Sequence, residues 1–82
     1  MNLLVFRNAR VDTDRVDIMN LTLSFGQLIS VHREKQGEPI QVAFRHDSVA
    51  KMAHKTLLRH LSLVKERLGP DVTVDLLEAT SL

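Results

Sequence analysis

A long amphipathic helix is the feature that most constrains what this chain can fold into. Between residues 48 and 68, apolar side chains recur at about 100° per residue and therefore share one helix face. Asp47 or Ser48 suits the N-cap, and Gly69 followed by Pro70 predicts the end of the helix. The apolar face comprises Val49, Ala50, Ala53, Leu57, Leu61, Val64 and Leu68. Such a face must be buried against a second layer, so we expect one helix packed on another element.

The N-terminal half of the chain predicts that second layer as a small antiparallel sheet. Residues 3–7 are apolar and rich enough in β-formers for a first strand. Between residues 19 and 33, apolar and polar side chains alternate with period two, which favours strands. A helix over the same residues would leave Leu23 off its apolar face and place Gly26 in its middle. Either one long strand bent at Gly26 or two strands joined there fits the alternation.

A hairpin is expected next, with strands near residues 28–35 and 38–45 joined by a two-residue turn at Gln36-Gly37. This register places apolar partners on one face and closes the turn with opposite charges. The expected partners are Lys35 with Glu38, Arg33 with Ile40, Val31 with Val42, and Ile29 with Phe44.

A last strand near residues 72–77 follows the Gly69-Pro70 stop. The sequence therefore predicts a single α+β domain over residues 1–82, in the order β-β-β-β-α-β. We expect a small antiparallel sheet, a meander of four to five strands, with one long amphipathic helix packed on one face. A chain of 82 residues is enough for one core, and no linker-like stretch divides it.

The composition excludes several kinds of chemistry. Without cysteine, the chain forms no disulfide, thiolate nucleophile or Cys-based zinc site, and a reducing compartment is favoured. The apolar run at residues 3–6 is too short for a signal peptide, and no stretch is long enough to cross a bilayer. We therefore expect a cytoplasmic protein that does not bind membranes.

Neither a metal site nor a catalytic motif is apparent. The four histidines, His32, His46, His54 and His60, have no metal-binding spacing. Asp12, Asp14 and Asp17 lack the glycine and glutamate of a calcium loop, and we interpret them as a solvated turn. His60 projects onto the apolar helix face, where we expect it to be partly buried. We predict no cofactor, no metal and no enzymatic activity.

The polar face of the helix carries a basic stripe, formed by Lys51, Lys55 and Arg59 at i, i+4 and i+8. Lys65 lies near its edge, and Leu58 sits among the cations. Residues 45–67 contain six basic and two acidic side chains, a net charge of +4, whereas the whole chain is +1. The stripe is either a solvated helix face or a surface that meets phosphates or an acidic partner.

Three functions fit these features. The first is a small non-enzymatic protein-interaction or regulatory module that docks to a larger protein through a strand edge, or to a second copy as a homodimer. The alternative is a nucleic-acid-binding accessory protein that uses the basic stripe. That alternative lacks stacking aromatics, because we expect Phe6, Phe25 and Phe44 in the core. The third, an enzyme or ligand carrier, needs a pocket for which the sequence gives no sign.

Overall fold

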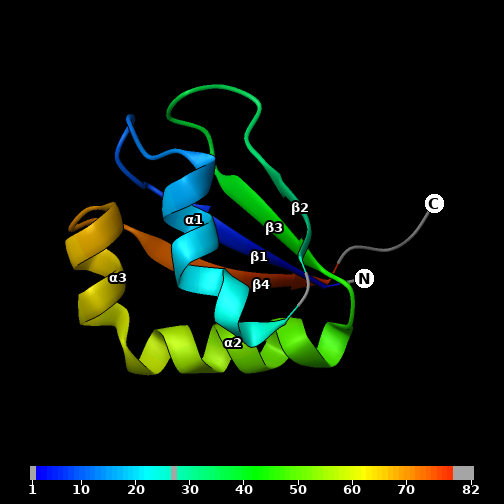
Figure 1. Cartoon of the computed structure of the whole chain (residues 1–82). Coiled ribbons are helices and arrows are strands. Elements are labelled where there is room, and N and C mark those ends of the chain that lie inside the picture. The colour runs from blue at the N-terminus through cyan, green and yellow to red at the C-terminus, as the bar shows by residue number, and fades with distance from the viewer. Residues whose placement is uncertain (1, 27, 79–82) are drawn as a thin grey trace.

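The chain folds into a four-stranded antiparallel sheet that carries helices (Figure 1). This computed structural model describes residues 2–26 and 28–78, with the backbone alone at Ile29. The strands are β1 (Asn2–Arg7), β2 (Leu28–His32), β3 (Ile40–Phe44) and β4 (Thr73–Glu78). The helices are α1 (Arg15–Thr22), the short 3₁₀ turn η1 (Leu23–Phe25), α2 (Asp47–Arg59) and α3 (Leu61–Leu68).

The strand order across the sheet is β2-β3-β1-β4, with every neighbouring pair antiparallel. The first strand along the chain is therefore central, and the last strand returns to pair beside it. Leu4 of β1 lies opposite Val42 of β3 on one side and Leu76 of β4 on the other. The order β-α-β-β-α-α-β replaces the expected meander, although the α+β class and the antiparallel sheet are confirmed.

The core lies between the sheet and the helices. Alternate strand residues, among them Leu4, Phe6, Val42 and Phe44, pack in one cluster with buried residues of α1, α2 and α3. These side chains are almost fully buried, and burying each one stabilises the fold by about 1.5–3 kcal/mol. Because all of them point to the same side of the sheet, the helices cover that side.

Residues 15–25 form helix rather than strand, so the period-two interpretation of this segment is wrong. Asp14 is the N-cap of α1: its side chain accepts from Asp17 N at 3.1 Å, and Asp17 Oδ2 accepts from Asp14 N at 3.0 Å. Leu21 is buried while Leu23 is 58% exposed, which a strand with one buried face does not allow. Strand structure in this region is confined to β2.

Gly26 marks the bend that the sequence indicates. It ends η1 with a φ of +153°, and a Cβ at this position would lie 3.0 Å from Val49 Cγ1. Both the backbone conformation and the close approach of α2 therefore require glycine here.

The single helix expected over residues 48–68 is two helices. His60 leaves helical geometry, with φ −118° and ψ 35°, and Figure 1 shows α3 running in a different direction from α2. The predicted apolar face is nevertheless used: Leu57 and Val64 are buried and Leu61 is half-buried. His60 itself is exposed, so the expectation of a partly buried histidine is wrong.

The hairpin between β2 and β3 is confirmed, but its strands are shorter than the expected 28–35 and 38–45, and its register differs at one position. Glu38 N donates to Lys35 O at 3.0 Å, which closes the turn over Gln36-Gly37. Val31 lies opposite Val42 as expected. A bulge between Leu28 and Ser30 places Leu28, not Ile29, opposite Phe44.

No helix among the described residues is both long and apolar enough to cross a bilayer.

Candidate functional site

In the part of the chain that the structure describes, no helix packs on the face of the sheet that points away from the core, and we call this the open face. Successive strand residues point to opposite faces, so the neighbours of the core residues must lie on this second side. The open face is defined by Leu3, Val5 and Arg7 of β1, Ser30 and His32 of β2, Gln41 and Ala43 of β3, and Thr73, Asp75 and Leu77 of β4.

One row across the open face is apolar. Leu3 of β1 lies between Ala43 of β3 and Leu77 of β4. Leu77, at the edge of the sheet, is 42% exposed, whereas Ala43 is buried in the sheet interior. Leu3 is half-buried, so most of the accessible apolar surface of this row belongs to Leu77.

The adjacent row is polar at both ends. Val5 lies between Gln41 and Asp75, and His32 lies beyond Gln41 on β2. Val5 is only 1% exposed, so the longer side chains around it on this face cover it. Gln41 and His32 are exposed and supply donor and acceptor groups for hydrogen bonds.

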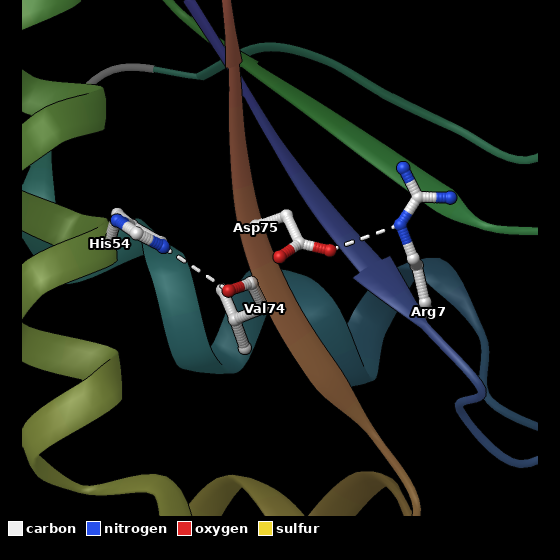
Figure 2. A network of polar contacts seen from close by, with 4 residues as sticks. All are labelled: Arg7, His54, Val74 and Asp75. Atoms are coloured by element: carbon white, nitrogen blue, oxygen red, sulfur yellow. Dashed lines mark hydrogen bonds and ion pairs between the residues drawn. The ribbon is translucent and has the colours of Figure 1, made fainter.

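An ion pair lies at the β4 end of this row. Figure 2 shows Arg7 Nε donating to Asp75 Oδ2, at 3.0 Å. Arg7 lies opposite Thr73 in the register, so its contact with Asp75 is diagonal across the two strands. The two side chains are 44% and 49% exposed, and part of the guanidinium remains available to solvent.

A second arginine lies at the other end of the central strands. Arg7 is the last residue of β1, and Arg45 directly follows the last residue of β3. Because β1 and β3 are antiparallel, the two arginines mark opposite ends of the central strand pair. Both are exposed.

Aromatic side chains are missing from the described open face. Phe6 and Phe44 point into the core, and Phe25 packs against it. The sequence-based assignment of the three phenylalanines to the core is therefore confirmed. The β1 and β3 positions that face outward instead carry Leu3, Val5, Gln41 and Ala43. Bases cannot stack on an aromatic ring at these positions.

The basic stripe predicted from the sequence lies on the other side of the molecule. Lys51, Lys55, Leu58 and Arg59 are all exposed on α2, and Leu58 is 46% exposed. Lys65 is also exposed, but it belongs to α3, which turns away after His60. Lys65 is therefore not continuous with Lys51, Lys55 and Arg59, and the helix layer separates these three from the open face.

The histidines are dispersed. His54 Nε2 lies 3.1 Å from Val74 O and joins α2 to the edge strand β4 (Figure 2). His32 is on the open face, 4.0 Å from Glu34. Within residues 2–26 and 28–78, no three His, Asp or Glu side chains gather as a metal site would require.

The open face was missed at the sequence level because its definition depends on strand order. Alternation does divide residues 3–7 into the two faces of a strand. Arg7 lies beside Asp75, however, only because β1 is central and pairs with β4. Those two residues are 68 positions apart in the chain. Nothing local in the sequence indicates the pairing.

The fold as a whole is similar to that of RRM domains. One crystal form of the RRM domain of S. pombe Puf1 matches with a TM-score of 0.78 and 26% identity, over 99% of this chain and 94% of that one. A second crystal form of the same domain matches with a TM-score of 0.71 and 22% identity, over 96% and 97%. No family model and no curated protein matches the chain. The chain therefore has an RRM-like fold.

Proposed function

We propose that this chain binds single-stranded nucleic acid on the open face of its sheet. The observation that carries the proposal is the RRM-like fold, in which a four-stranded sheet leaves one face free of helices. RRM domains bind RNA on such a sheet. This supports nucleic-acid binding over docking to a protein, and it moves the expected surface from the basic stripe to the sheet.

The expected binding mode follows from the composition of the open face. Base stacking on aromatic side chains contributes about 1–3 kcal/mol per base, and this face lacks that contribution. The contacts that remain are those of Arg7 and Arg45 with phosphates and the hydrogen bonds of Gln41 and His32. We therefore expect weak, salt-dependent binding with little sequence preference.

A protein partner is the second candidate function. The observation that favours it is the apolar row of Ala43, Leu3 and Leu77, which suits an apolar contact as well as a nucleic acid. An RNA competitor tests whether both use this face, because RNA displaces only a protein that is bound at the same surface.

The test is fluorescence anisotropy with a labelled single-stranded RNA of about 12 nucleotides, a length within the range that single-strand-binding modules cover. Two double variants carry the same change in charge. Arg7→Gln with Arg45→Gln removes the arginines at the two ends of the central strands, and Lys55→Gln with Arg59→Gln alters the basic stripe. Each removes two exposed positive charges. Circular dichroism and urea unfolding check that both remain folded.

We expect the sheet variant to lose most of its affinity and the stripe variant to lose little. For single strands, each phosphate contact contributes about 0.7 to the slope of log K against log salt, so the sheet variant should lower the slope by about 1.4. Equal losses of affinity in both variants would show that binding depends on the overall positive charge of the chain and not on the sheet. A larger loss in the stripe variant would move the site to α2, and no binding by the native chain would reject the proposal.

A further inference from the structure

A groove opens on the helix side of the molecule, away from the open face. It lies between α1 and η1 on one side and α2 and α3 on the other, with a volume of about 260 Å³. This is below the roughly 300–1,000 Å³ of typical small-molecule sites, so it suits a single inserted side chain better than a cofactor. Its lining includes Phe25, Leu57 and Leu63, with Asn20, His60 and Arg67.

The turn at His60 creates this groove. A continuous helix would carry Leu63 and Arg67 along the line of α2. The non-helical backbone at His60 instead directs α3 away from α2, as Figure 1 shows, and both helices then border the same hollow. Hydrogen bonds fix the turn, because His60 N donates to Thr56 O at 3.2 Å and to Leu57 O at 3.1 Å. The groove is therefore built into the backbone.

The groove combines an apolar interior with positive charge. Leu57 is 5% exposed and forms part of its floor, while Leu63 remains 43% exposed beside it. Arg67 is exposed, and no ion pair or hydrogen bond with the described residues engages its guanidinium. No carboxylate is among the described lining residues, and the neighbouring Glu66 is exposed outside the groove.

We propose that this groove docks a short acidic segment of a partner protein. A large apolar side chain of that segment enters between Phe25, Leu57 and Leu63, and a carboxylate next to it pairs with Arg67. Charge complementarity selects the partner, since the lining carries a cation without an anion. The apolar lining favours a peptide over a nucleic acid. The inference does not depend on nucleic-acid binding, because the groove and the open face use different residues.

The test uses three synthetic peptides and NMR shift mapping on the ¹⁵N-labelled full chain. The first peptide is acetyl-Asp-Glu-Phe-Glu-Asp-amide. The second replaces its phenylalanine with alanine, and the third replaces its four acids with lysine. We expect the first to shift amides of residues 20–25 and 56–67. Loss of one large apolar contact should weaken the alanine peptide by about tenfold or more, and the lysine peptide should not bind.

Two pairs of variants separate the groove from the rest of the helix surface. Arg67→Glu should weaken the acidic peptide several-fold, whereas Arg59→Glu makes the same charge change outside the groove and should not. Leu63→Ser and Leu58→Ser remove leucines of similar exposure, 43% and 46%, and only the first borders the groove. Urea unfolding of each variant checks the fold.

Several results would overturn the proposal. They are a shift pattern centred on the sheet, equal binding of the phenylalanine and alanine peptides, equal binding of acidic and basic peptides, or no binding at millimolar peptide. Sedimentation of the free chain adds one more: a dimer that breaks up in Leu63→Ser would assign the groove to a second copy of this chain instead.

Discussion

Arg7 Nε donates to Asp75 Oδ2 at 3.0 Å, and this diagonal pair joins the central strand β1 to the edge strand β4 on the open face. The pair places a carboxylate on the surface on which phosphates are expected. Asp75 both orients Arg7 and reduces the positive potential around it. The open face is therefore less favourable to nucleic acid than its arginines alone suggest.

Removing that carboxylate should strengthen RNA binding. Asp75→Asn leaves the side-chain shape unchanged and frees Arg7 for a phosphate. Because both side chains are nearly half exposed, we expect a gain of about two- to fivefold in affinity and less than about 1 kcal/mol loss in the free energy of unfolding. Anisotropy at fixed salt and urea unfolding measure the two effects. Glu66→Gln makes the same charge change on α3, and an equal gain there would show that only net charge matters.

The contact between His54 and the edge strand should contribute to stability. His54 Nε2 lies 3.1 Å from Val74 O, and His54 is half-buried. His54→Ala removes this part-buried hydrogen bond, which should lower the free energy of unfolding by about 1 kcal/mol. Urea unfolding measures the loss. His46→Ala is the control, because His46 is exposed and its side chain makes no cap hydrogen bond; equal losses would assign no role to the contact.

The capping box of α1 should also make a measurable contribution to the free energy of unfolding. Asp14→Ala removes the acceptor for Asp17 N and should cost about 1 kcal/mol in the free energy of unfolding. Asp12→Ala changes an exposed aspartate outside the helix and should cost much less. If the two variants unfold at the same urea concentration, the cap does not stabilise α1.

This cap explains why the first half of the fold was harder to predict than the second. Asp14 and Asp17 stand three residues apart, the spacing of a capping box, but aspartates are equally typical of turns. The apolar residues that follow happen to fall on odd positions, which imitates a strand. The helix has only eight residues, too few for its own period to dominate.

No feature of the sequence indicates that the helix breaks at His60. No glycine or proline interrupts residues 47–68, and the apolar rhythm continues through the turn. Packing decides the direction of α3, whose end is tied to the loop after β1 by the hydrogen bond from Arg10 N to Leu68 O at 2.7 Å. By contrast, the β2–β3 hairpin and β4 were predictable, since alternation and turn chemistry specify them locally.

The strongest test of the proposed RNA surface is to supply the stacking that it lacks. Gln41 is exposed on the open face of β3, opposite Val5 of the central strand. Gln41→Phe places an aromatic ring where a base can lie on it, and aromatic residues are favourable in strands. The gain in binding free energy should reach about 1–3 kcal/mol, or roughly 5- to 150-fold in affinity.

Ser62→Phe is the control, because it adds the same ring to the exposed surface of α3 and should leave the affinity for RNA unchanged. If only Gln41→Phe tightens binding, and the slope of log K against log salt stays that of the native chain, then bases lie on β3. If neither variant or both variants tighten binding, the RNA lies elsewhere.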